Sequence, residues 1–386
     1  MRRGTYVRWG VPVAAAAVIG AAIGAGPVIA AVSGDPVLPE RSAEQLLADA
    51  ASATSKAGGV PPMSGTVQQT ASLGLPALPQ TADTSPLSLL SGSHEVKVWY
   101  GAHDKVRVAI PTQLNETNLI LDGDQGWYWD SSTNTATRLT VKKDAGQEHR
   151  TPMPQASDLT PQQLSERLLA DAEQYTDVRV INTAEVAGRP AYQLVLSPKA
   201  EGSLVQEVRI ALDGETYVPL QVQVYAKGSA EPAFQVGFTQ VTFTPPAPEN
   251  FAFAPPAGAK VEERTLGDRP HGEHVAEERA EQAEHVKDRV KVVGDGWASV
   301  AVLPFDQKEL AAKAAQAPEG GERFGPDADP KALLDSVLKS ATPVSGPWGS
   351  GKLIKTKLVT ALLTDDGRML VGPVTPEEIT KAAGTK

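Results

Sequence analysis

The sequence contains no cysteine among its 386 residues. Disulfide bonds, thiolate nucleophiles, cysteine-ligated zinc sites and acylation at a lipoprotein signal cysteine are therefore all excluded. Basic residues are also outnumbered, with 36 lysines and arginines against 46 acidic residues and a formal net charge of −10. Because phosphate binding favours a basic surface, this charge argues against a nucleic-acid partner.

The sequence also lacks the motifs of the common enzyme classes. There is no G-x-S-x-G nucleophile motif, and no serine, histidine and acid fall together at convincing turn positions. The segment GPWGSGKL ends in Leu353, where a phosphate-binding loop needs a hydroxyl for magnesium. His271, His274 and His285 lie in a charged segment without the H-E-x-x-H spacing of a metal site. We therefore expect no catalytic residue, no metal and no cofactor.

The N-terminus carries a basic region followed by an apolar run. Arg2, Arg3 and Arg8 precede the uncharged stretch Trp9–Ser33, which is rich in alanine, glycine, valine and isoleucine. This pattern is typical of an export signal, with cleavage possible after Ala30. The run is also long enough to span a bilayer as an uncleaved anchor. Both alternatives predict an extracytoplasmic chain, either secreted or anchored to the cytoplasmic membrane.

Strict alternation of apolar and polar side chains dominates the middle of the chain. Four successive segments show it: Tyr192–Leu196, Val208–Leu212, Leu220–Val224 and Phe234–Phe238. Successive side chains of a strand point to opposite faces, so the pattern indicates a sheet with one apolar and one polar face. His94–Tyr100 and Lys105–Ile110 alternate in the same way, and Leu119–Leu139 has the turns of short strands. Together these segments predict a curved antiparallel sheet of about eleven strands.

An apolar sheet face must be covered by helices, by a ligand or by closure of the sheet. Two amphipathic helices are expected, one from Ser42, with Gln45 completing a capping box, and one from Thr160. The long loop from Ser72 to Ser93 carries six leucines, which a merely solvated loop would not hold. We expect a lid made of the first helix and this loop, with these apolar side chains: Leu46, Leu47, Leu73 and Leu75.

The composition changes after Pro245. A proline-rich exit leads to the densely charged segment His271–Lys291, which favours a solvated helix or linker. The tail beyond Gly294 has the patterns of strands and helices, and is either a small α+β module or extra elements packed on the main sheet. The expected divisions are a signal peptide or anchor at 1–33, a half-barrel domain at 40–258, a charged helical linker at 259–293 and an extension at 294–386.

Four motifs occur in an order that resembles the LolA and RseB-like superfamily of periplasmic lipoprotein carriers and sigma-factor regulators. They are ILDGDQGWYWDSSTNTATRL (Ile120–Leu139), EVAGRPAYQLVLSPK (Glu185–Lys199), VRIALDGETYVPLQVQVY (Val208–Tyr225) and FAFAPPAGAKV (Phe251–Val261). The resemblance covers roughly half of the chain, and the tail resembles extensions on actinobacterial members. It implies a mainly β (α+β) fold, a half-open antiparallel barrel with a helical lid, whose cavity takes the acyl chains of a lipid or lipoprotein.

The side chains expected to line this cavity are those on the apolar face of the strands. Aromatic residues make up only 5% of the chain, so the paired Trp127 and Trp129 stand out. Core packing of a hairpin is their ordinary role, and lining one rim of the cavity is the functional alternative. The complete candidate set is Val96, Val98, Val108, Trp127, Trp129, Tyr192, Leu194, Ile210, Val222 and Val236. The aliphatic members become ligand contacts only if the helices do not fill the barrel.

Two functions from different classes follow from these patterns. The first is non-enzymatic binding of a hydrophobic ligand, with acyl chains and the membrane surface as partners. The second is a cell-envelope regulator that binds a membrane-bound anti-sigma factor or receptor, with the tail and the charged segment as its partner surface. An enzyme would need a polar cluster in the cavity, and the sequence offers none.

Overall fold

The computed structural model describes residues 37–55, 59–74, 91–141, 169–266, 290–306 and 336–385. The apolar N-terminal run, most of the leucine-rich loop and the charged segment with its histidines lie outside these residues, as does the second helix apart from residues 169–173, which are helical. No helix in the described ranges has both the length and the apolar character needed to cross a membrane.

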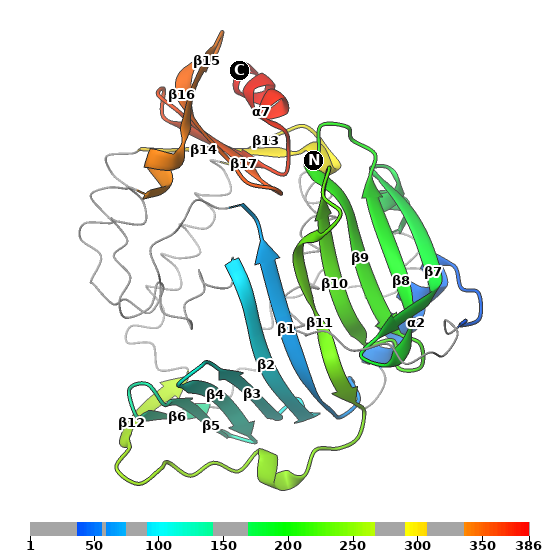
Figure 1. Ribbon diagram of the computed structural model, residues 1–386, viewed down its shortest axis with the longest axis vertical. Coiled ribbons are helices and arrows are strands. Elements are labelled where there is room, and N and C mark those ends of the chain that lie inside the picture. The colour runs from blue at the N-terminus through cyan, green and yellow to red at the C-terminus, as the bar shows by residue number, and fades with distance from the viewer. Residues whose placement is uncertain are drawn as a thin grey trace.

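Most of the described chain forms one large antiparallel sheet (Figure 1). Its strands are β1 (Met63–Ser72), β2 (Ser91–Ala102), β3 (Lys105–Pro111), β4 (Glu116–Asp122), β5 (Gln125–Asp130), β6 (Thr135–Val141), β7 (Thr176–Val186), β8 (Arg189–Pro198), β9 (Val205–Asp213), β10 (Pro219–Ala226), β11 (Pro232–Thr242) and β12 (Lys260–Leu266). The order is β12-β6-β5-β4-β3-β2-β1-β11-β10-β9-β8-β7, so the twelve-stranded sheet stays open, with β12 and β7 at its edges.

The sheet is strongly curved, as the half-barrel prediction requires. In Figure 1 the strands β3–β6 lie at a steep angle to β7–β11, with β1 and β2 between them. At the other end the sheet rolls up, because β7 comes into contact with β11 although β8, β9 and β10 separate the two strands in the sheet. The predicted fold class, an open antiparallel half-barrel, is therefore confirmed, with one strand more than the expected number.

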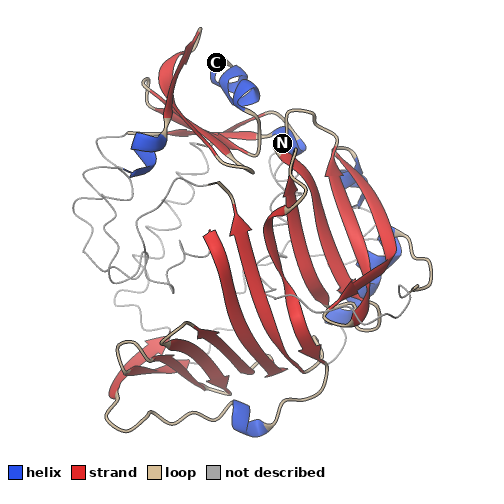
Figure 2. Ribbon diagram, in the orientation of Figure 1, coloured by secondary structure: helices blue, strands red, loops and turns tan. Residues whose placement is uncertain are grey.

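The first helix, α2 (Ala43–Ser55), packs on one face of this sheet, which we call the inner face. Its start carries the expected capping box. The Ser42 Oγ accepts a hydrogen bond from the Gln45 amide at 3.2 Å, and the Ser42 amide donates to Gln45 Oε1 at 3.1 Å. Leu46 is fully buried among apolar side chains of β8–β11. The helix passes behind β7 and β8 in Figure 2.

The structure corrects the boundary predicted at residue 258. Lys260–Leu266 was expected to begin a helical linker, but it forms β12 and pairs in parallel with β6. Its sequence is highly charged, which an edge strand tolerates because its outer side needs no apolar partner. The remainder of the expected linker lies outside the described residues until β13 (Lys291–Val293).

The tail forms a second, smaller sheet. Its strands are β13, β14 (Val300–Pro304), β15 (Thr342–Gly346), β16 (Gly349–Lys355), β17 (Thr360–Thr364) and β18 (Arg368–Gly372), followed by the helix α7 (Pro376–Ala383). Residues 336–340 are also helical. The six strands run in the order β13-β14-β18-β17-β16-β15 and share with α7 a separate core that includes Leu362, Leu370 and Ile379. The segment GPWGSGKL lies at the β15–β16 hairpin, so it is no phosphate loop.

The small sheet is docked on the end of the large one. Trp297, in the turn before β14, is 3% exposed and belongs to the core under α2. Its indole N–H donates to Thr176 Oγ1 of β7 at 2.8 Å. The Leu204 amide donates to Pro373 O at 2.7 Å, and the Thr375 amide to Gly202 O at 2.9 Å. The tail therefore combines both expected alternatives, since it has its own core and also packs on the main sheet.

Candidate functional site

The inner face carries a row of apolar side chains that runs across β2–β5. The register places Val98 beside Val108, Val108 beside Leu119, and Leu119 beside Tyr128. Val98 and Val108 are half-buried, whereas Leu119 is 37% exposed and Tyr128 is 41% exposed. Exposed large apolar side chains that lie side by side are less usual than single ones and often mark a binding surface.

Tyr128 contributes an uncharged phenol to this apolar row. Partial burial raises the pKa of Tyr128, and the nearby Asp130 carboxylate raises it further, while a hydrogen bond with Thr117 acts in the opposite direction. Its pKa thus lies above the usual value of about 10. The ring therefore stays neutral at physiological pH and adds apolar surface with one polar tip.

Five of the predicted cavity residues lie instead in the core beneath α2. They are Tyr192, Leu194, Ile210, Val222 and Val236, all at most 8% exposed. Leu46 of α2 belongs to the same cluster, with Leu47 and Ala50 packed against it. The helix therefore fills this half of the barrel, which is the condition under which these side chains serve the core. Whether any of them contacts a ligand stays a prediction.

Tyr192 shows how firmly this half is filled. Its hydroxyl donates a hydrogen bond to Pro39 O at 2.9 Å, so the segment before α2 closes over it. Its ring stacks on Tyr217 with centroids 6.4 Å apart and an interplanar angle of 7°. A buried tyrosine whose hydroxyl is satisfied in this way is a structural residue.

Trp127 and Trp129 are not on the inner face. The register places Trp127 beside Ile120 and Trp129 beside Asn118, one residue out of step with the row of Leu119 and Tyr128. Both rings pack on Phe253, with centroids 5.4 Å and 6.1 Å away. The chain between β11 and β12 carries Phe253 over the outer face. The two tryptophans thus lie on the opposite face from Val96 and Val98, and whether they line the rim of a ligand cavity stays a prediction.

The predicted lid residues lie in different parts of the structure. Leu46 is buried in the core and Leu47 is half-buried against it. The carbonyl of Leu73 accepts a hydrogen bond from the Lys357 amide at 2.7 Å, and Lys357 Nζ donates to Ser72 Oγ at 2.8 Å. The start of the leucine-rich loop is thus attached to the small sheet. Leu75 lies outside the described residues.

A cavity of about 510 Å³ opens on the outer face, between the β4–β5 hairpin and the segment after β11. Trp127, Phe251 and Phe253 form its aromatic side. Asp122 and Asp124 are at its rim, where Asp122 pairs with Lys105 at 3.3 Å. Arg138 lies 5.9 Å from the centre of the Trp127 ring and already occupies the position of a cation over it. The charged groups of this cavity therefore have partners within the chain.

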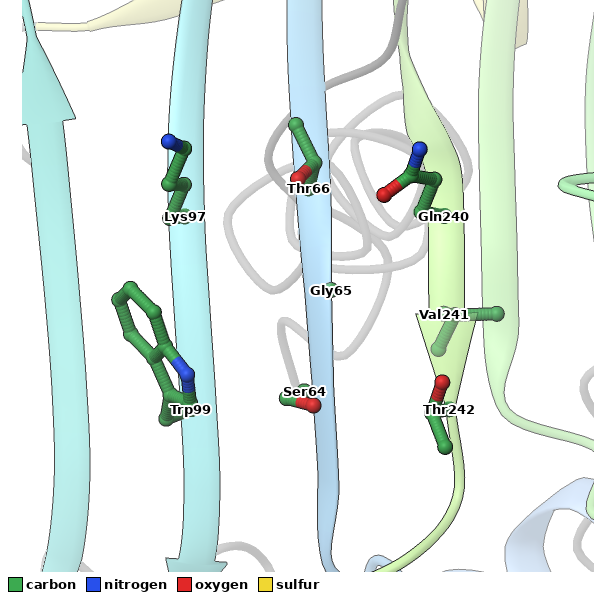
Figure 3. Close-up of a pocket in the computed structure, with 8 residues that line it drawn as sticks. All are labelled: Ser64, Gly65, Thr66, Lys97, Trp99, Gln240, Val241 and Thr242. Carbon is green, nitrogen blue, oxygen red and sulfur yellow. The ribbon is translucent and has the colours of Figure 1, made fainter. Parts of the chain in front are cut away.

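A second cavity, of about 190 Å³, lies on the outer face of β1, β2 and β11 (Figure 3). Gly65 and Val241 belong to its lining, together with five polar residues and one tryptophan: Ser64, Thr66, Lys97, Gln240, Thr242 and Trp99. Sequence reasoning missed this group. The signal was present as the polar half of the alternation, but only the register shows that three distant segments place these residues side by side.

One strongly perturbed carboxylate is structural. Burial alone would raise the pKa of Asp213, but hydrogen bonds from Arg189 and from the amide and hydroxyl of Thr216 lower it below its usual value. The Thr216 amide donates to Asp213 Oδ1 at 2.8 Å, and its hydroxyl donates to the same oxygen at 2.9 Å. Asp213 therefore fixes the β9–β10 turn. Across the described ranges, no group of three or more acidic or histidine side chains has the arrangement of a metal site.

The fold and this geometry define a half-barrel with one filled half and one open apolar row. Residues 82–262 match the family model described as "Predicted periplasmic protein (DUF2092)". The match spans a little under half of the chain and reaches from before β2 into β12. No curated protein matches the chain.

Several solved structures are similar to the chain. One is the Pseudomonas aeruginosa MucA/MucB complex, at 14% identity and a TM-score of 0.38, with 88% of this chain and 96% of that chain covered. A LolA superfamily protein from Nitrosomonas europaea is 11% identical with a TM-score of 0.21, covering 55% of this chain and 99% of its own. An uncharacterised conserved protein from Thermus thermophilus is 13% identical with a TM-score of 0.30, covering 58% and 100%. At these levels the similarities identify neither a ligand nor a partner.

Proposed function

We propose that this chain is a non-enzymatic extracytoplasmic protein that binds the acyl chain of a lipid or lipoprotein on the inner face of its half-barrel. The observation that carries the proposal is the apolar row Val98–Val108–Leu119–Tyr128, whose last two members remain exposed. The extracytoplasmic location is supported by the export-type N-terminus and by the description of the matching family as predicted periplasmic.

The division of the sheet supports a site at β2–β5. Under β8–β11 the inner face is packed by α2 in the part of the chain that the structure describes, which favours a ligand site elsewhere on this face. Under β4 and β5 the outer face is packed instead, because Ile120 and Trp129 are buried while the inner face exposes Leu119 and Tyr128. In β4 and β5 the buried side chains therefore lie on the outer face and the exposed apolar side chains lie on the inner face. This is the reverse of the usual arrangement, in which the inner face of a sheet is buried in the core.

Tight binding of an acyl chain requires more apolar surface than this row provides. Burial of an acyl chain is worth about 0.8 kcal/mol per methylene, so about ten methylenes give roughly 8 kcal/mol before the cost of association. That cost is of similar size, about 4–15 kcal/mol, so a chain lying on an open sheet would bind weakly. A second apolar wall is therefore needed. The leucines between Ser72 and Ser93 are the part of the sequence suited to supply it.

Release of the ligand would require a better environment elsewhere. A lid changes the rate of exchange, but it shifts the equilibrium only through a difference in affinity between its two positions. The membrane surface or a partner protein would therefore have to offer the acyl chain a more favourable site. Transfer of this kind needs no catalytic group.

The second candidate function is a cell-envelope regulator that binds a membrane-bound anti-sigma factor or receptor. The docked tail favours it, because Trp297 and the Leu204–Pro373 contact join the small sheet to the half-barrel as one partner surface. The two functions differ in their genetic context. Neighbouring genes for a sigma factor and its inhibitor would favour the regulator, whereas lipoprotein or transport genes would favour the carrier.

Native mass spectrometry of the protein from Ala31 onward, followed by lipid extraction, tests the proposal. We expect bound lipid or acyl species of defined mass. A well-folded protein that stays empty when offered lipid vesicles would contradict acyl binding. That result would leave the regulator as the favoured function.

A further inference from the structure

The outer face carries two rows of side chains that lie directly across three strands. The register of β2, β1 and β11 places Trp99, Ser64 and Thr242 in one row, and Lys97, Thr66 and Gln240 in the next. All six line the cavity of about 190 Å³ shown in Figure 3. Because neighbouring strands are about 5 Å apart and alternate residues about 7 Å apart, the grid measures roughly 10 Å by 7 Å.

The polar groups of this grid are available to a ligand. In the ranges that the structure describes, the side chains of Ser64, Thr66, Gln240 and Thr242 are not engaged in any hydrogen bond that stabilises the fold. Gln240 and Thr242 are exposed, and Ser64 and Thr66 are half-buried. Lys97 is exposed as well and has only the distant Glu95 carboxylate at 4.0 Å. Hydroxyls, an amide and an ammonium group thus point outward from the same face of three neighbouring strands.

Trp99 gives this surface an apolar platform with a fixed position. The guanidinium of Arg107 lies 5.2 Å from the centre of the Trp99 ring. Arg107 is itself held, because its Nε donates to Asn118 Oδ1 at 3.0 Å. The ring is therefore supported from the β3 side. In Figure 3 it leans from β2 away from β1, and Trp99 lines the edge of the cavity. A preorganised aromatic ring loses little conformational freedom when it binds a ligand.

A bulge in β11 decides which of its side chains belong to the grid. Thr239 of β11 is an extra residue, since Thr66 pairs with Gln240 but Val67 pairs with Phe238. Phe238 shares the inner face with Val236, and the bulge after it places Gln240 and Thr242 on the outer face, beside Thr66 and Ser64. The Phe238 ring lies over Gly65, where a Cβ would come within 2.7 Å of it. Gly65 stands between the two rows in Figure 3 and adds no side chain to either of them.

From this arrangement we infer that the grid is a binding site for a sugar ring of a glycan. A pyranose has an apolar C–H face that stacks on an indole, and an edge of hydroxyls that matches hydroxyl, amide and ammonium groups. The cavity is too small for a drug-sized ligand, which needs roughly 300–1,000 Å³, but it suits one ring. The site is on the opposite face from the apolar row, so it stands or falls independently of acyl binding.

Saturation-transfer NMR of the purified chain with glucose, N-acetylglucosamine, glucuronate and short oligosaccharides of each provides the test. Thr66→Val and Thr70→Val form a matched pair, because both residues are on β1 and on the same face, but only Thr66 belongs to the grid. Loss of one hydrogen bond weakens binding about fivefold, so we expect this change for Thr66→Val and none for Thr70→Val. Trp99→Ala should remove the signal, with circular dichroism confirming its fold.

The outcomes separate the alternatives. Binding that weakens in Thr66→Val and in Gln240→Leu supports the site, and a preference for glucuronate assigns a carboxylate contact to Lys97. Absence of transfer from wild-type protein to every sugar overturns the inference. Binding that survives Trp99→Ala, or that is equal in the two threonine variants, overturns it as well.

Discussion

Leu119 and Tyr128 lie directly opposite each other on β4 and β5, and both remain more than a third exposed on the inner face. If this pair is part of an acyl site, Leu119→Asp places a charge where methylenes would bind and should reduce the lipid recovered with the protein at least tenfold. Its unfolding free energy should change by less than about 0.5 kcal/mol, because the position is exposed. Mass spectrometry and urea unfolding measure the two effects.

The control for this variant is Leu114→Asp. Leu114 is 91% exposed in the turn between β3 and β4, away from the apolar row. The same substitution there should leave both lipid content and stability unchanged. Equal lipid content in wild type, Leu119→Asp and Leu114→Asp would exclude the β4–β5 surface as the acyl site.

Leu46 should be the residue through which α2 stabilises the half-barrel. It is fully buried, while the adjacent Leu47 is only partly buried. Leu46→Ala removes buried methyl groups and leaves a cavity, so we expect a loss of about 2–5 kcal/mol in the free energy of unfolding. Leu47→Ala should cost clearly less. Urea unfolding compares them, and a smaller loss for Leu46→Ala than for Leu47→Ala would mean that the helix is not anchored as described.

Leu194→Glu should prevent folding. Leu194 is 3% exposed in the cluster that contains Leu46, and an unpaired carboxylate there has no hydrogen-bond partner. Gln193→Glu is the control, because the neighbouring side chain points to the other face. Circular dichroism should show an unfolded Leu194→Glu and a native Gln193→Glu. A folded Leu194→Glu with wild-type stability would contradict the placement of this strand.

Much of the fold follows from local patterns in the sequence. Alternation at Val208–Leu212 and Phe234–Phe238 marks strands, and Ser42 with Gln45 marks the start of α2. The faces of Trp127 and Trp129 do not follow from such patterns. A period of two shows that they share a face, but the choice of face depends on pairing with β4 and on Phe253, over a hundred residues later.

The polar grid and the strand β12 were not predicted from the sequence, for related reasons. Thr66, Lys97 and Gln240 come from three segments that meet only through strand register, and each alone is an ordinary polar position on a sheet. In β12 the charged sequence KVEERTL lacks a clear apolar alternation. A parallel edge strand added after a long connection is specified by tertiary pairing with β6, which local periodicity does not encode.

Asp213 should make stability depend on pH in the acidic range. Its pKa is lowered in the folded chain, so its contribution is fully present above the unfolded-state pKa of about 3.9 and is lost as pH falls through the folded value. Asp213→Asn removes the partner of Arg189 and should cost about 3 kcal/mol at pH 7. The difference from wild type should shrink below pH 4.

The control for this effect is Asp366→Asn. Asp366 also pairs with an arginine, Arg368 at 2.7 Å, but its side chain is 51% exposed. An exposed pair contributes about 0–1 kcal/mol, so this variant should differ little from wild type at any pH. Urea unfolding from pH 3 to pH 7 compares the two variants. A pH-independent deficit in Asp213→Asn would show that packing, and not the charge, is what Asp213 provides.

Trp297 should couple the small sheet to the large one. Its indole N–H donates to Thr176 Oγ1 at 2.8 Å, and both side chains are buried. Trp297→Phe keeps most of the apolar contact but removes the donor, so it should cost about 1–3 kcal/mol in unfolding free energy. Thr176→Val removes the acceptor, and because the same bond is lost in both variants, the double variant should cost about 1 kcal/mol less than the sum. Trp348→Phe, at the half-buried tip of the β15–β16 hairpin, is the control and should be nearly neutral. If the losses in unfolding free energy for Trp297→Phe and Thr176→Val are strictly additive, the hydrogen bond does not join the two sheets. The surface proposed to bind a regulatory partner would then lack its central contact.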